Sequence, residues 1–178
     1  MPMKGSHMPT VDETRTDDVK RRIAAASPEP WLVSRDEQGD RMITTGRSDR
    51  GRLYIKRDLA AASDEDFAFI ALARSALPRL LEAVTTGDFN ALTTDELSEI
   101  EAVLARTSAG PWTAFLEETQ PIGGCSMIWV GDEADAPDMY VWLEDNIAPA
   151  GDIEFIAAAR EDLPDLLSEI RYLRGKGR

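Results

Sequence analysis

The chain contains the same helical segment twice. Residues 66–81 have the sequence DFAFIALARSALPRLL and residues 152–167 have DIEFIAAAREDLPDLL, so the two segments are identical at ten of sixteen positions. Such self-similarity is typical of a fold built from repeated units. In each segment a proline follows an arginine by four residues and removes the donor for that arginine's carbonyl. We expect two related long helices, bent or broken near Pro78 and Pro164.

Three shorter matches follow the same order in both halves of the chain. They are ASPEPW (26–31) with TSAGPW (107–112), RMITTG (41–46) with SMIWVG (126–131), and LYIKRD (53–58) with MYVWLE (139–144). Short alternating segments rich in aromatic and β-branched residues predict strands. The order of the matches therefore predicts two α-β-β-β-α units, with longer loops in the second unit.

Each unit should begin with an amphipathic helix. Thr16 and Thr94 are each followed by two acidic residues, as is typical of helix N-caps. One three-stranded sheet with two helices is a marginal core, so two units should pack around a pseudo-twofold axis. We predict an α+β fold with one six-stranded, largely antiparallel sheet covered by helices, in preference to two independent lobes.

The first eight residues, MPMKGSHM, have the sequence of an expression-tag remnant and are left out of the fold prediction. The two repeats then occupy residues 9–88 and 89–178, as one compact domain in preference to two. Cys125 is the only cysteine, which excludes an intrachain disulfide. No apolar run approaches the ~18 residues needed to span a bilayer. These features indicate a cytoplasmic protein with no membrane partner.

The sequence lacks the residues of common catalytic sites. His7, in the excluded segment, is the only histidine, so a Ser-His-Asp triad, a Cys-His pair and a histidine-based zinc site are not expected. PIGGCS (121–126) lacks the glycine spacing and the lysine of a phosphate-binding loop. We expect no catalytic residue, no metal and no cofactor, and hence no enzyme. A weak divalent-ion site in the acidic segment GDEADAPD (131–138), serving carboxylate catalysis, is a third possibility.

Charge differs strongly between the two units. Residues 9–88 hold 15 acidic and 13 basic residues, a net charge of −2, whereas residues 89–178 hold 18 and 6, a net charge of −12. With Lys4 these give the total of −13. A chain of this charge repels phosphates, so nucleic acid is not the expected partner. The arginine-rich segment 41–57 is a local exception, and it could contact the acidic half of a second copy to form a homodimer.

The two units also differ in their aromatic residues. Alternation places one apolar face on the strands of both units, which we expect to be the core: Ile43, Leu53, Ile55, Ile128, Met139 and Val141. On the opposite face, Thr44 and Lys56 of the first unit correspond to Trp129 and Trp142 of the second. These indoles are either covered by a helix or chain end, or form an exposed aromatic patch with an acidic rim, which is the make-up of an interface.

The leading hypothesis is a non-enzymatic binding protein that captures a basic protein partner, such as a toxin or a nucleic-acid-binding protein. Immunity proteins and phage inhibitors have this profile, and the phrase FIAAAREDLPDLL (155–167) resembles helical segments of bacterial and phage-borne proteins. The expected partner-binding residues are three aromatic residues and six carboxylates: Trp129, Tyr140, Trp142, Asp132, Glu133, Asp135, Asp138, Glu144 and Asp145.

The alternative hypothesis is a small-ligand module. Two units around an axis leave a cleft, where Trp31, Trp112, Arg74 and Arg160 could surround a nucleotide or another anion. The structural interpretation of the two arginines is that each ties its helix to a nearby carboxylate or free carbonyl.

Overall fold

The computed structural model describes residues 12–46, 52–57, 60–119, 126–131, 138–143 and 146–176. The helices in these ranges are α1 (Glu13–Ala25), α2 (Asp64–Thr86), α3 (Thr94–Leu104), α4 (Ala150–Lys176) and the 3-10 turn η1 (Phe89–Ala91). The strands are β1 (Leu32–Arg35), β2 (Arg41–Thr44), β3 (Arg52–Arg57), β4 (Ala60–Ala61), β5 (Trp112–Phe115), β6 (Met127–Val130), β7 (Met139–Leu143) and β8 (Asn146–Ile147).

The main strands form one sheet in the order β1-β2-β3-β7-β6-β5, and every neighbouring pair is antiparallel. The two-residue strands β4 and β8 pair with β3 and β7. At the centre of the sheet, β3 lies beside β7 with Ile55 opposite Val141. The α+β class and the single six-stranded antiparallel sheet are therefore confirmed.

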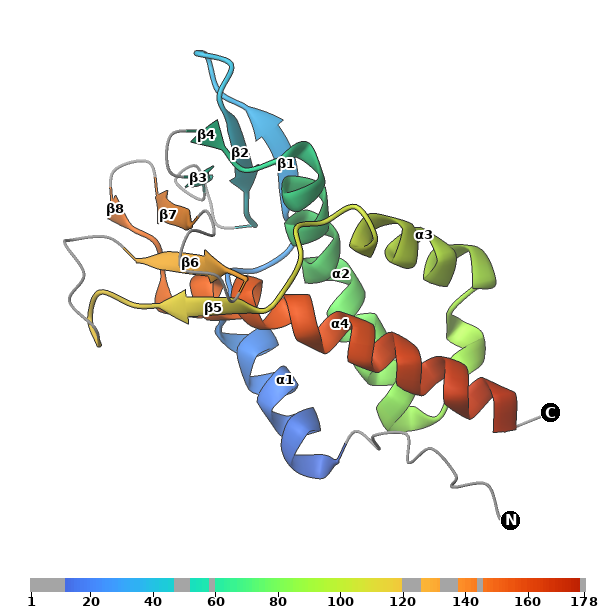
Figure 1. Ribbon diagram of the computed structural model, residues 1–178. Coiled ribbons are helices and arrows are strands. Elements are labelled where there is room, and N and C mark those ends of the chain that lie inside the picture. Colours follow the sequence, from blue (N-terminus) through green and yellow to red (C-terminus); the bar gives the residue numbers. More distant parts are fainter. Residues whose placement is uncertain are drawn as a thin grey trace, which may run out of the picture.

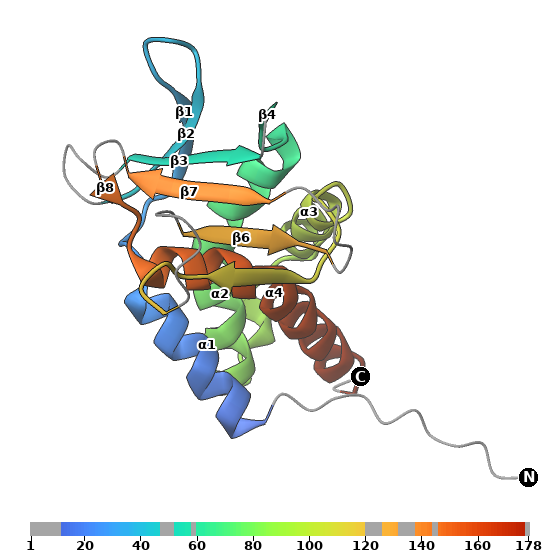
Figure 2. The same ribbon diagram turned by 60° about the vertical axis from the view of Figure 1, so that its left-hand side comes forward.

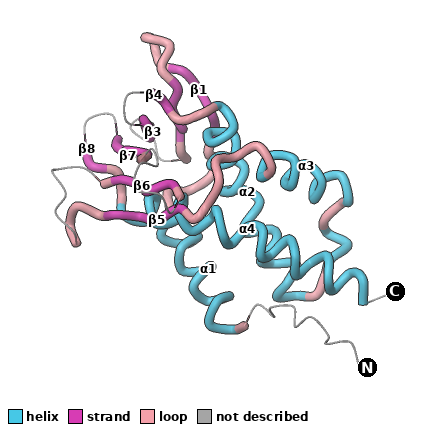
Figure 3. The backbone as a smooth tube through the Cα atoms, viewed as in Figure 1, coloured by secondary structure: helices cyan, strands magenta, loops and turns pink. Residues whose placement is uncertain are grey.

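The helices lie together on one side of this sheet (Figures 1 and 2). Helix α2 contacts β1 and β2, α4 contacts β5 and β6, and the two long helices pack against each other. The tube view shows helices and strands as separate layers (Figure 3). The strand residues predicted to face the core are at most 1% exposed, which confirms that prediction: Ile43, Leu53, Ile55, Ile128, Met139 and Val141.

The predicted helix starts are wrong at both N-caps. Helix α1 begins one turn before Thr16, because the Asp12 carboxylate accepts a hydrogen bond from the Arg15 N–H at 2.8 Å. Helix α3 is capped by Thr93 and not by Thr94. Only Thr93 has a glutamate three residues later, and the reciprocal bonds of a capping box require that spacing.

Both long helices continue through their prolines, so neither is broken there, while a bend at these positions stays a prediction. Pro78 lies inside α2 and Pro164 inside α4, and each removes one main-chain hydrogen bond. The residues before them, Leu77 and Leu163, are at most 1% exposed. Burial of such side chains against the sheet outweighs one lost hydrogen bond.

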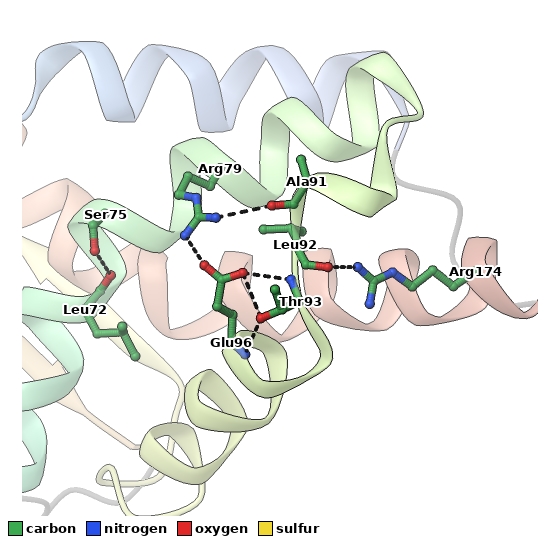
Figure 4. A network of polar contacts seen from close by, with 8 residues as sticks. All are labelled: Leu72, Ser75, Arg79, Ala91, Leu92, Thr93, Glu96 and Arg174. Atoms are coloured by element: carbon green, nitrogen blue, oxygen red, sulfur yellow. Dashed lines mark hydrogen bonds and ion pairs between the residues drawn. The ribbon is translucent and has the colours of Figure 1, made fainter.

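A polar cluster joins α2, α3 and α4 away from the sheet (Figure 4). Arg79 in α2 donates to the Glu96 carboxylate in α3 at 2.6 Å, and that carboxylate accepts from the Thr93 N–H at 2.7 Å. These hydrogen bonds, the one from Arg79 first, lower the pKa of Glu96 from 4.5 to about 2. Arg174 in α4 donates to the Leu92 carbonyl just before the cap.

Candidate functional site

The sheet side facing away from the helices is aromatic. Tyr54 and Trp142 are cross-strand neighbours whose rings stack at 6.4 Å, and the rings of Phe115 and Trp129 are 5.6 Å apart. Strand pairing places two further residues on the same side, because directly opposed residues share a face. We call this set, all half-buried, the aromatic face: Tyr54, Phe115, Met127, Trp129, Tyr140 and Trp142.

No helix among the described residues lies over the aromatic face (Figure 1). Its side chains bury one another in part. Trp129 and Trp142 are therefore half-buried, between the covered state and the exposed state that the sequence left open. Ile147, opposite Trp142 on β8, is 53% exposed and extends the apolar surface. The indole N–H of Trp129 is shielded from water and has no acceptor within the described chain.

The expected acidic rim falls largely outside the described residues. Asp138 is half-buried at the start of β7, next to Met139. The other five carboxylates lie in the ranges that are not described: Asp132, Glu133, Asp135, Glu144 and Asp145. Cys125 also lies in a range that is not described. The aromatic members of the predicted site are thus brought onto one surface, while the acidic members are not placed.

Three of the four residues of the alternative cleft, Trp31, Trp112 and Arg74, are buried in the packed structure, and Arg160 is half-buried. Trp31 and Trp112 are each 4% exposed and pack edge-on against Phe155 and Phe69, with ring centroids 5.5 and 5.4 Å apart. Phe69 belongs to α2 and Phe155 to α4, so each indole packs against the long helix of the other half of the chain.

Both arginines make the contact expected from the structural interpretation. Arg74 Nε donates to the Ser27 carbonyl at 3.0 Å, and Arg160 Nε donates to the Ser108 carbonyl at 3.0 Å. Burial lowers the pKa of Arg74, against the raising effects of Glu29 and Asp152. Burial likewise lowers the pKa of Arg160.

The same two serines bind buried carboxylates from the opposite half. Asp152 accepts from the N–H and hydroxyl of Ser27 at 2.5 and 2.6 Å, and Asp66 accepts from those of Ser108 at 2.9 and 2.9 Å. Sequence analysis did not single out these four residues. The signal was present, since both aspartates open the repeated helical segment and both serines precede the Pro-Trp pairs.

A groove of about 640 Å³ runs beside β5, between α1 and α4. We call it the β5 groove, and its lining residues are Arg21, Arg22, Ala25, Trp112, Thr113, Ala114, Glu154, Ala157 and Ala158. Arg22 is held by Asp162 at 2.6 Å, and Arg21 by Asp18 at 2.9 Å. The charges of both arginines are therefore engaged by the protein itself.

The basic segment 41–57 is described only in part. Arg41 forms an ion pair with Asp64 at the start of α2, so its charge is satisfied within the chain. Arg47 and Arg50 lie outside the described residues. A homodimer through this segment stays a prediction.

In the described ranges, no three His, Cys, Asp or Glu side chains are grouped so that they could hold a metal ion. None of the helices described combines the length and the apolar character needed to cross a membrane. A comparison of the chain with protein-family models, curated proteins and solved structures finds no match.

Proposed function

We propose that this chain is a non-enzymatic, cytoplasmic binding protein that captures a basic protein partner, in the manner of immunity proteins or phage inhibitors. The observation that carries the proposal is the aromatic face, which no described helix covers. Large aromatic side chains at the centre of a surface are typical of the residues that dominate binding energy.

Charge supports the choice of a basic partner. Residues 89–178 carry a net charge of −12, and they supply five of the six residues of the aromatic face, all except Tyr54. A field of one sign accelerates the encounter with a partner of opposite sign, while desolvated aromatic residues slow its release. The proposed roles are therefore steering by the carboxylates and retention by Trp129, Tyr140 and Trp142.

The proposal is tested by affinity capture from source-cell lysate at low salt, followed by mass spectrometry. Trp129→Ala with Trp142→Ala should abolish retention of a basic protein, and neutralisation of Asp132, Glu133, Asp135 and Asp138 should slow its association at least tenfold. The matched control neutralises four exposed carboxylates on the helices, Glu65, Glu82, Asp95 and Glu99. Retention that is equal in all three variants contradicts the proposal.

We also propose that the chain is a tandem repeat of two α-β-β-β-α units, 9–88 and 89–178, related by a pseudo-twofold axis between β3 and β7. A shift of 81 residues turns Ser27 into Ser108, and a shift of 86 turns Asp66 into Asp152. The contact between Ser27 and Asp152 then corresponds to that between Ser108 and Asp66. In this view the tryptophans at 129 and 142 are additions to one unit, which is why we assign them to binding.

The small-ligand alternative has one observation in its favour, namely the β5 groove beside Trp112. Its volume is in the range of small-molecule sites, about 300–1,000 Å³. A screen of nucleotides and other anions by thermal shift at high salt would test it, because binding in a groove resists salt better than steered capture does. Stabilisation by such a ligand, lost in Glu154 and Ala158 variants, would support this alternative.

A further inference from the structure

We propose that the β5 groove receives strand β1 of a second copy of this chain, so that the sheet continues from one molecule into the next. The inference concerns a surface different from the aromatic face and does not rest on the proposed capture of a basic partner. It follows from the two ends of the sheet: β1 exposes aliphatic side chains, and a groove lies beside β5.

The outer edge of β5 presents main-chain groups toward the groove. The Gly131 N–H donates to the Pro111 carbonyl at 2.7 Å, which fixes 111 and 131 as a hydrogen-bonded pair of the β5-β6 ladder. Such pairs alternate along an antiparallel ladder. The N–H and C=O of Ala114 therefore point away from β6, and Ala114 lines the groove.

Two side chains that line the groove, Ala114 and Ala158, are smaller than their counterparts in the first unit. The first unit has Val33 at the position that matches Ala114, and Leu72 at the position that matches Ala158. Leu72 packs against the core, whereas Ala158 leaves that space open in the β5 groove. Two aliphatic side chains are thus missing on this edge of the sheet, next to main-chain groups that accept a strand.

Strand β1 exposes aliphatic side chains of the kind that the groove lacks. The large hydrophobic side chains exposed in the described part of the chain are Leu32 at 56%, Val33 at 44% and Ile147 at 53%. Two of the three are consecutive in β1, at the opposite end of the sheet. Exposed apolar edge strands are a template for pairing with another chain.

The main chain of β1 is also oriented for pairing. The Asp36 N–H donates to the Asp40 carbonyl at 2.9 Å, so residues 36 and 40 are a hydrogen-bonded pair of the β1-β2 ladder. Because such pairs alternate along the ladder, the N–H and C=O of Val33 and Arg35 point away from β2. Added to β5, such a strand would direct one of its two aliphatic side chains into the groove and the other toward Thr113. Arg35, which is exposed, would meet the acidic half of the neighbouring molecule.

The two contacting surfaces are different, so the association is head to tail and can continue from copy to copy.

Sedimentation velocity over a concentration series tests this association with two variants. Val33→Lys places a charge on the β1 edge, and Ala114→Val with Ala158→Leu fills the groove with the residues of the first unit. Thermal melts followed by circular dichroism verify that both variants are folded.

We expect the unmodified chain to form larger species as concentration rises, and each variant alone to stay monomeric, with at least tenfold weaker association. A mixture of the two variants should form a one-to-one dimer that grows no further, because one supplies an intact groove and the other an intact β1. Two outcomes overturn the proposal: an unmodified chain that is monomeric at every concentration, or a mixture that forms no dimer.

Salt separates this association from the capture of a basic partner. Two chains of net charge −13 repel each other, so self-association should strengthen as salt screens them, whereas steered capture should weaken.

A labelled peptide of residues 30–36 provides a second readout of strand binding in the β5 groove. It should bind the Val33→Lys variant, with its open groove, and not the groove-filled variant, while a scrambled peptide should bind neither; equal binding to both variants overturns the proposal.

Discussion

At the scale of single residues, two buried aspartates hold the halves of the chain together. Asp152 is fully buried and satisfies the N–H and hydroxyl of Ser27, which is itself 1% exposed. Asp66 does the same for Ser108, which is only half-buried. Each aspartate lies at the start of one long helix and each serine precedes a Pro-Trp pair, so the four bonds fix both helices against the sheet.

Asp152→Ala should lower the free energy of unfolding more than Asp66→Ala does. Removing a buried acceptor leaves its donors unsatisfied, at a cost of about 1–3 kcal/mol for each group. Water can reach Ser108 more easily than Ser27, which reduces the cost on that side. Urea unfolding of the two variants measures the difference. The order would be contradicted by an Asp66→Ala variant that is the less stable of the two.

Glu96 should make the protein sensitive to acid. Its pKa falls from 4.5 to about 2 on folding, so its contribution to stability is complete above pH 4.5 and is lost as pH drops toward 2. Glu96→Gln should remove that part of the pH dependence and leave the melting temperature less sensitive to pH in this window. Melts between these two pH values measure it.

The control for this variant is Glu99→Gln, on the exposed side of the same helix. It should leave the slope of melting temperature against pH close to that of the unmodified chain. Equal slopes for the unmodified chain and Glu96→Gln would show that the bonds to Arg79 and Thr93 do not stabilise the fold.

At the scale of elements, α4 lies close against the end of α1 at Gly151. A Cβ at this position would overlap the main-chain carbonyl of Ala25, the last residue of α1. Gly151→Ala should therefore lower the free energy of unfolding by about 1–3 kcal/mol, as overpacking does, although alanine is the better helix former.

Gly175 offers a matched control in the same helix, because a Cβ there would meet nothing within 4 Å. Gly175→Ala should be neutral or stabilise by up to about 1 kcal/mol through helix propensity alone. Urea unfolding of both variants distinguishes packing from propensity. A Gly151→Ala variant as stable as Gly175→Ala would show that α1 can move away from α4 without cost.

Most elements could be predicted from the sequence, because alternation and the repeated segment carry their signal locally. The core face of β6 and β7 follows from the period of two, with Ile128 and Val141 buried as expected. The order of the strands also depends on the contact between β3 and β7, for which no local pattern exists. The exposure of Trp129 and Trp142 depends on which face the helices occupy, so the sequence left two states open.

The bonds from the aspartates to Ser27 and Ser108 were not predictable for a related reason. They join residues 125 and 42 positions apart, and a serine a few residues ahead of a proline has many other structural roles. Only the proposed equivalence of the two halves would have indicated them.

At the scale of the whole molecule, the two halves of the chain are parts of one core. The β3-β7 contact joins them in the sheet, and the packing of Trp31 on Phe155 and of Trp112 on Phe69 joins them beneath it. Neither half can satisfy its buried aspartate or cover its buried indole alone. The molecule should therefore unfold in a single transition, with coincident curves from tryptophan fluorescence and circular dichroism.

A division of the chain in the exposed turn between Gly87 and Phe89 tests this dependence. Fragments 9–88 and 89–178 should each lack a cooperative transition, because each loses half of the sheet and the partners of its buried groups. Mixed at equal concentration, they should recover a cooperative transition as a one-to-one complex, and Asp152→Ala in the second fragment should weaken that complex by at least tenfold. A fragment that unfolds cooperatively by itself, at a temperature near that of the intact chain, would show instead that the two halves are two domains, each with a core of its own.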